Sequence, residues 1–173
     1  MIRTVPEPAR LQRPTARFLF AHPAHFVALG FGAGLARVAP GTAGTLVAIP
    51  IAWALAAWTS SVVFVVVIVA ALLGGAWAAQ RTGAALGAAD HGSIVIDEIA
   101  AFLLMLFLVG LSPQRVVLAF VLFRIFDIVK PPPIRAVDAR FKSGIGVMAD
   151  DLIAAVFALV VFAIVVRLTG WPR

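Results

Sequence analysis

Long apolar runs alternate with short polar segments along this chain, and this pattern predicts membrane-spanning helices. A helix needs roughly 20 residues to cross a bilayer, and five runs approach that length, although some are short enough to lie partly in the interface. They cover residues 42–58, 62–79, 94–111, 116–129 and 148–168. The pattern therefore predicts an all-α fold, a polytopic helical bundle of about five spans in a membrane.

The segment before the first predicted span is too rich in glycine and proline for a regular spanning helix. It reads GFGAGLARVAPGTAGTL over residues 30–46, and it predicts an irregular or re-entrant entry with a turn at Pro40 and Gly41. Thr42 or Thr45 is expected to cap the helix that follows, and the free N–H groups of such a helix end can bind phosphate. A cap of this kind is more often only structural.

Composition excludes an ordinary soluble domain, because 62% of the 173 residues are hydrophobic and only 13% are charged. The absence of cysteine excludes disulfides, thiolate metal sites and a cysteine nucleophile. The net charge is +6, but the basic residues lie beside apolar spans and form no single soluble face. We therefore expect no nucleic-acid partner and expect anionic lipid headgroups instead.

Basic residues also predict the domain boundary and the orientation. Residues 1–25 carry four arginines among prolines and are expected to form a basic arm on the membrane surface, followed by one helical membrane domain over residues 26–173. A cleaved signal peptide is the competing interpretation, although its apolar core would be short and broken by glycines. Cytoplasmic loops are enriched in lysine and arginine, so the N-terminus is expected inside and the C-terminus outside. The basic residues expected inside, besides those of the arm, are Arg37, Arg81, Lys130, Arg135, Arg140 and Lys142, against Arg115, Arg167 and Arg173 at the other end.

The acids are the most informative polar residues. The chain has eight, and five of them lie in or at the edge of predicted spans, all toward the cytoplasmic end. Gathered in a low-dielectric site they would repel one another unless a cation neutralised them. Oxygen ligands without cysteine favour Mg²⁺ or Mn²⁺ over zinc. These five are the expected metal ligands and catalytic acids or bases: Asp97, Glu98, Asp127, Asp150 and Asp151. For the last two alone, a favourable position at a helix N-terminus is the simpler explanation.

Charged residues interrupt the fourth apolar run at a regular spacing. In the motif FRIFDIVKPPP, Arg124, Asp127 and Lys130 follow one another at three-residue steps, which places neighbours on roughly one helical face. The prolines then end the helix. We expect Arg124 and Lys130 to bind phosphate beside the acids. The alternative is a structural ion pair between Arg124 and Asp127, with Lys130 reaching the membrane surface.

A histidine lies in the short polar segment before the third span. His91 follows Asp90 and lies on the same predicted side as Asp97. It is a candidate proton donor to a leaving oxygen, or a group that polarises a water molecule. An ordinary loop histidine is an equally good interpretation.

Four motifs, in this order, resemble phosphatidylglycerophosphatase A, a family of bacterial inner-membrane lipid phosphatases. They are GFGAGLARVAPGTAG from Gly30, DHGSIVIDE from Asp90, FRIFDIVKPPP from Phe123 and GIGVMADD from Gly144. The resemblance implies Mg²⁺-dependent removal of the terminal phosphate from phosphatidylglycerophosphate, which gives phosphatidylglycerol. It also implies a multi-pass protein of the inner membrane with its active site facing the cytoplasm.

The chain departs from the family pattern at three positions. Ala101 and Ser143 replace usual glycines, and Thr45 stands where serine is usual. None of these changes removes a charge or an oxygen ligand, so they are expected to alter only packing and loop geometry.

Other functions on the same residues fit less well. The motifs of phosphatidic-acid-type phosphatases and of CDP-alcohol phosphotransferases are absent. A cation-coupled carrier that uses the same acids is the non-enzymatic alternative. Such a carrier is expected to hold its polar site near the bilayer midplane, whereas here the acids concentrate at one face.

Overall fold

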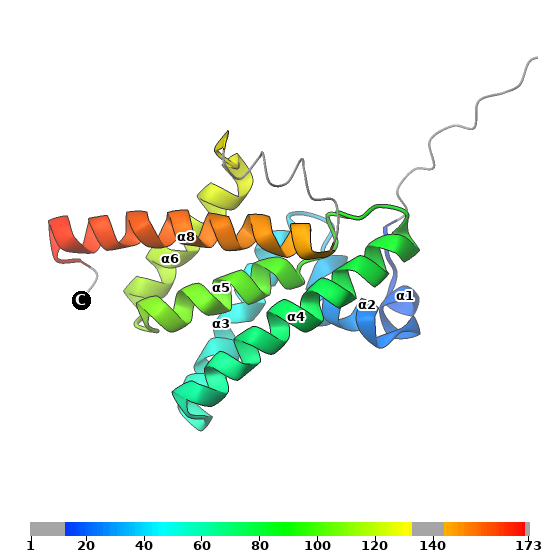
Figure 1. Cartoon of the computed structure of the whole chain (residues 1–173), viewed down its shortest axis with the longest axis horizontal. Helices are drawn as coiled ribbons and strands as arrows, with labels where there is room; N and C mark the ends of the chain where they lie inside the picture. The colour runs from blue at the N-terminus through cyan, green and yellow to red at the C-terminus, as the bar shows by residue number, and fades with distance from the viewer. Residues whose placement is uncertain (1–12, 133–143, 172–173) are drawn as a thin grey trace, which may run out of the picture.

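The structure, a computed structural model, describes residues 13–132 and 144–171, and every regular element in these ranges is helical (Figure 1). The predicted all-α fold is therefore confirmed. Outside the described residues lie Ser143 and several of the basic residues used for the orientation, namely Arg3, Arg10, Arg135, Arg140, Lys142 and Arg173.

Five long helices correspond to the five predicted apolar runs. They are α3 (Pro40–Trp58), α4 (Ser61–Leu86), α5 (Ile96–Val109), α6 (Pro113–Val129) and α8 (Gly144–Thr169). Among the described residues, α3, α4 and α8 are long and apolar enough to cross a membrane. The helices α5 and α6 are shorter, with 14 and 17 residues.

Helix α5 occupies the centre of the bundle and packs against α3, α4, α6 and α8 (Figure 1). Its side chains are buried around most of its circumference, including Ile99, Phe102 and Leu106. A helix that is apolar all round is expected in the interior of a bundle. Ala101 is also fully buried, so the core accommodates its methyl group.

Two short helices precede the bundle and lie beside the C-terminal half of α4 (Figure 1). In α1 (Ala16–Ala21), the hydroxyl oxygen of Thr15 accepts from Phe18 N at 3.3 Å. In α2 (Pro23–Ala28), His22 Nδ1 accepts from Ala24 N at 3.0 Å. Side-chain acceptors of this kind satisfy the free N–H groups of a first helical turn. The part of the predicted basic arm that the structure describes is therefore helical.

The glycine-rich entry forms the irregular 3₁₀ segment η1 (Gly30–Leu35), as its composition predicts. Phe31 and Gly32 have positive φ angles of 59° and 111°. A side chain on Gly34 would overlap the carbonyl of Ser93, and one on Gly44 would overlap Val95. These glycines therefore let η1 and α3 pack directly against the loop that leads into α5.

The predicted turn and cap before the first span are wrong in detail. Helix α3 already begins at Pro40, and Ala39 precedes it in the left-handed region with φ 47°. Proline suits the first helical position because its missing N–H would have no partner there. Pro40 and Gly41 are thus helical, and neither Thr42 nor Thr45 caps the helix by a side-chain hydrogen bond.

Candidate active site

Three carboxylates from two helices meet at one end of the bundle. Asp97 and Glu98 lie in the first turn of α5, and Asp151 lies in α8. One carboxylate oxygen from each lies within 4.8 Å of the others. Their segments are far apart in the sequence, and the contact between α5 and α8 brings them together.

The other two predicted acids lie next to this group. Asp127, at the end of α6, shares Arg124 with Glu98, and Asp150 directly precedes Asp151 in α8. The structure therefore gathers all five predicted acids into one cluster, as the sequence suggests. Helix α8 begins at Gly144, four residues before the predicted start at Met148, so Asp150 and Asp151 lie beyond its first turn. Stabilisation by the N-terminus of α8 therefore does not explain this acidic pair, because that effect falls off within the first turn.

Several carboxylate oxygens of the cluster are buried without a hydrogen-bond partner. Within the described part of the chain these include Asp97 Oδ1, Glu98 Oε2 and Asp151 Oδ2. A buried acceptor that is left unsatisfied costs about 1–3 kcal/mol, and more when it is charged. A set of convergent oxygen ligands without sulfur or nitrogen suits a hard divalent cation such as Mg²⁺. Asp97, Glu98 and Asp151 therefore fit a divalent metal ion.

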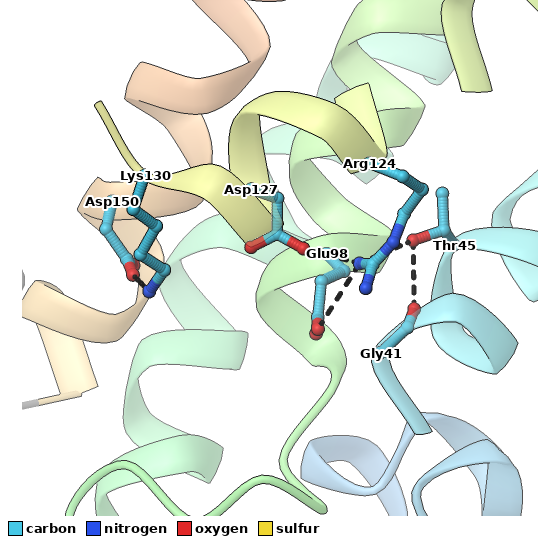
Figure 2. Close-up of polar contacts among 7 residues, drawn as sticks. All are labelled: Gly41, Thr45, Glu98, Arg124, Asp127, Lys130 and Asp150. Carbon is cyan, nitrogen blue, oxygen red and sulfur yellow. Dashed lines mark hydrogen bonds and ion pairs between the residues drawn. The ribbon is translucent and has the colours of Figure 1, made fainter. Parts of the chain in front are cut away.

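Arg124, on α6, contacts two carboxylates of this cluster (Figure 2). Its Nη1 atom lies 2.5 Å from Asp127 Oδ2, one turn further along α6, and 3.8 Å from Glu98 Oε1 on α5. The structural ion pair considered above is therefore present, but Arg124 also reaches α5. Since arginine has five N–H donors in a planar fork, it keeps donors beyond Nη1 for a phosphate.

Thr45 completes the surroundings of Arg124 from α3. Its hydroxyl is fully buried, donates to the carbonyl of Gly41 at 2.9 Å and accepts from Arg124 Nη1 at 3.4 Å (Figure 2). A hydroxyl has one hydrogen, and here Gly41 receives it. Thr45 therefore contacts Arg124, and its predicted contact with the substrate phosphate stays a prediction. Thr42, the other predicted phosphate contact, lies half-buried in the first turn of α3.

Sequence reasoning missed Gly41 as a residue of the site. A Cβ atom on Gly41 would overlap Glu98 Oε1 and lie 3.3 Å from Arg124 Nη1. The signal in the sequence was the run of small residues after Pro40, which permits a helix to approach a neighbour closely.

Lys130 forms an ion pair with Asp150 that local sequence patterns do not show. Lys130 caps the C-terminus of α6 in the left-handed region, with φ 42°, and its Nζ atom contacts Asp150 Oδ2 on α8 (Figure 2). The Asp150 side chain is only 6% exposed. Both predicted phosphate-binding cations therefore lie at the cluster and neutralise part of its charge.

His91 lies in a separate small cavity of about 260 Å³ beside the N-terminus of α3. Its Nδ1 atom accepts from Ser93 N at 3.2 Å, and Arg13 and Arg37 line the same cavity. Burial lowers the pKa of His91 below its ordinary value, although Asp90 opposes the shift. The group of three converging carboxylates does not include His91. Its predicted role as proton donor stays a prediction.

Comparisons with known proteins agree on one family. The family model of phosphatidylglycerophosphatase A matches residues 26–166. A protein of Haemophilus influenzae with that name is 40% identical over 153 residues, which cover 87% of this chain and 94% of the relative. Another with the same name, from Escherichia coli, is 38% identical over 144 residues, 83% of each chain.

A third relative carries a different name. It is a "putative phosphatidylinositol-3-phosphatase" of Bacteroides thetaiotaomicron, 37% identical over 149 residues, which cover 80% of this chain and 90% of the relative. The names of all three relatives describe phosphatases of a phospholipid. No solved structure matches the chain.

Proposed function

Because the chain belongs to the phosphatidylglycerophosphatase A family, we propose that it hydrolyses phosphatidylglycerophosphate to phosphatidylglycerol and inorganic phosphate. The family model covers most of the chain, and two relatives carry this name. The name of the third relative indicates a different headgroup but the same kind of bond, a terminal phosphomonoester on a lipid. In the reaction the bond between phosphorus and the glycerol oxygen breaks, a water oxygen bonds to phosphorus, and the leaving oxygen takes a proton.

The proposal includes a Mg²⁺ ion held by Asp97, Glu98 and Asp151. The observation that carries it is the convergence of their carboxylate oxygens within 4.8 Å, with one buried oxygen of each lacking a hydrogen-bond partner. When bound, such an ion neutralises charge on the phosphate oxygens and orients the phosphate. Without a cation, these acids repel both one another and an anionic substrate.

The basic residues have distinct parts in this proposal. Arg124 binds the substrate phosphate through the donors that Asp127 and Glu98 leave available, while its contacts with Asp127 and Thr45 hold the guanidinium in place. Lys130 offsets the charge of Asp150 at the edge of the cluster. An acid of the cluster that does not bind the metal ion is then the candidate general base.

We also place the protein in the bacterial inner membrane with the acidic cluster at the cytoplasmic face. The excess of basic residues around this end of the helices supports that orientation. The phosphatase names of the family and of the relatives give no support to the carrier alternative.

The proposal is tested with purified full-length protein in detergent micelles. We expect phosphate release from phosphatidylglycerophosphate with Mg²⁺, and none after removal of divalent ions with EDTA. Phosphatidylinositol 3-phosphate serves as the comparison substrate and is expected to react more slowly. A folded protein that releases no phosphate from either lipid, with or without Mg²⁺, would contradict the proposal, and equal release in EDTA would contradict its metal.

A further inference from the structure

A second cavity, of about 780 Å³, lies between the N-terminal helices and α4. The residues that line it include His22, His25, Trp77, Gln80 and Arg81, and none of them belongs to the acidic cluster. In Figure 1 this region is where α1 and α2 pack beside the C-terminal half of α4. The proposed phosphatase reaction uses none of these residues, so that reaction does not account for the cavity.

The cavity carries positive charge and lacks an acidic partner. Arg81 is its charged residue, His22 and His25 are its titratable ones, and no carboxylate lines it. Within the described residues, no Asp or Glu forms an ion pair with Arg81. A guanidinium that has no carboxylate beside it favours an anion as its ligand.

The contact between His22 and Arg81 positions this guanidinium in the cavity. Arg81 Nε donates to His22 Nε2 at 3.2 Å. The Nη groups of Arg81 have no carboxylate partner among the described residues, so they can donate to the oxygens of an anion. Desolvation, together with the positive charges of Arg81 and His25, lowers the pKa of His22.

The surroundings of the cavity place it at the level of lipid headgroups. Trp77 lines the cavity and is 56% exposed. Tryptophan side chains are enriched at the membrane interface. Before Trp77, α4 is apolar and without charge, whereas Gln80 and Arg81 lie three and four residues after it. The cavity therefore opens where a helix leaves the hydrocarbon region.

We propose that this cavity is a binding site for the phosphodiester headgroup of an anionic phospholipid, separate from the acidic cluster. The phosphate oxygens accept from the Nη groups of Arg81, and the acyl chains lie along Trp77 and the apolar face of α4. A zwitterionic lipid carries a positive amine that this cavity, without carboxylates, does not balance. The bound lipid is part of the surrounding membrane, and phosphatidylglycerol has the required chemistry.

The test uses Trp77 as the reporter. The variant background W53F/W58F/W171F leaves it as the only tryptophan in the chain. The protein is reconstituted into vesicles of phosphatidylcholine that contain equal fractions of either phosphatidylglycerol or phosphatidylcholine with brominated acyl chains, which quench tryptophan fluorescence. We expect stronger quenching by the brominated phosphatidylglycerol. In Arg81→Gln this preference should fall about fivefold, because one basic residue near a membrane surface contributes about that factor to the binding of an anionic lipid.

The control is Arg17→Gln, which removes an exposed arginine of α1 that does not line the cavity. It should keep the full preference, and Arg81→Lys should keep most of it and serves if Arg81→Gln does not fold. Equal quenching by the two lipids, or a preference that survives in folded Arg81→Gln, would overturn the proposal. Loss of the preference on addition of inorganic phosphate would overturn the lipid as ligand and indicate a site for free phosphate. Because the readout is binding, it does not depend on the phosphatase activity.

Discussion

Gly41 on α3 faces Glu98 on α5 so closely that a Cβ atom at position 41 would overlap the carboxylate oxygen Oε1 (Figure 2). Glu98 is one of the three converging carboxylates, and its Oε1 atom is also the one nearest to Arg124. The absence of a side chain on α3 therefore determines where a candidate metal ligand can lie.

Gly41→Ala is expected to lower activity strongly, because the new methyl group displaces Glu98 from its position. Misplacement of a reacting group by about 1 Å can cost on the order of 100-fold in rate. The measurement is phosphate release as a function of Mg²⁺ concentration, together with the unfolding temperature.

The matched control is Gly74→Ala on α4, where an added Cβ atom meets nothing within 4 Å. Because alanine is the better helix former by about 1 kcal/mol, this variant should keep its activity and unfold at the same or a higher temperature. Equal activity in both variants would show that the close approach of Gly41 to Glu98 has no catalytic importance.

Thr45→Val tests whether the hydroxyl positions Arg124. Valine keeps the shape of threonine but removes the oxygen that accepts from Arg124 Nη1. A hydrogen bond to a charged group contributes about 1.5–3 kcal/mol, so kcat/KM should fall roughly 10- to 100-fold. Thr45→Ser keeps the hydroxyl and should retain most of the activity.

A direct phosphate contact from Thr45 would also be lost in valine, so the readout must separate the two roles. A positioning role predicts that Arg124→Lys and Thr45→Val are non-additive, since both act through the same guanidinium. Additive losses in the double variant would contradict the positioning role.

The apolar pattern of the sequence predicted the helices well, because burial in lipid or in the core leaves long runs without charge. It also predicted that the five acids meet, since each run carries its acids toward the same end. Helix starts were less predictable: α8 begins at Gly144, and glycine is a weak helix former. Tertiary packing requires glycine at this helix start, since a side chain at Gly144 would overlap the backbone of α4 at Ala76.

The partners of the charges could not be predicted from the sequence. Regular spacing along α6 indicated the pair of Arg124 and Asp127, which are three residues apart. The pair of Lys130 and Asp150 joins residues that are 20 positions apart in the sequence, across the end of one helix and the second turn of another. Such a contact depends on how α6 and α8 pack, and hydrophobic periodicity does not contain that information.

His91 predicts a pH dependence of stability. Burial lowers its pKa in the folded protein below the ordinary value of 6.5, so the unfolded chain binds a proton that the folded protein does not. The contribution of His91 to stability is therefore present above pH 6.5 and is lost as the pH falls through the folded pKa. On acidification from pH 7.5 to about pH 5, the wild type should lose more stability than His91→Gln.

The measurement is the difference in unfolding temperature between wild type and His91→Gln across that pH range. This difference isolates His91, because the other titrating groups are common to both proteins. Parallel curves for wild type and His91→Gln would contradict the shifted pKa of His91.

The proposed orientation predicts which positions a membrane-impermeant thiol reagent can reach. The chain has no cysteine, so a single introduced cysteine reports its own position. Ser60→Cys, between α3 and α4, should react in intact cells, whereas Gly92→Cys should react only after the membrane is opened. Both positions are exposed, which makes the two variants comparable. The reverse result would place the acidic cluster on the outer side.

Asp150 and Asp151 are neighbours on α8, but their surroundings predict opposite effects of the same substitution. Asp151 converges with Asp97 and Glu98, and one of its oxygens is buried without a hydrogen-bond partner. Asp151→Asn removes a repelled charge and a metal ligand. Without Mg²⁺, this variant should therefore unfold at a higher temperature than the wild type. Addition of Mg²⁺ should raise its unfolding temperature by less than it raises that of the wild type. The variant should also need about ten times more Mg²⁺ for activity.

Asp150→Asn should behave differently, because the carboxylate of Asp150 pairs with Lys130. Removal of one member of a buried ion pair leaves the other charge uncompensated and costs up to about 3–5 kcal/mol, less here because the Lys130 side chain is 24% exposed. We expect a lower unfolding temperature without Mg²⁺ and a nearly unchanged rise on its addition. Lys130→Met combined with Asp150→Asn should recover part of the lost stability, since it removes the stranded charge. If the two single variants instead respond alike to Mg²⁺, the assignment of Asp151 to the metal and Asp150 to the ion pair is wrong.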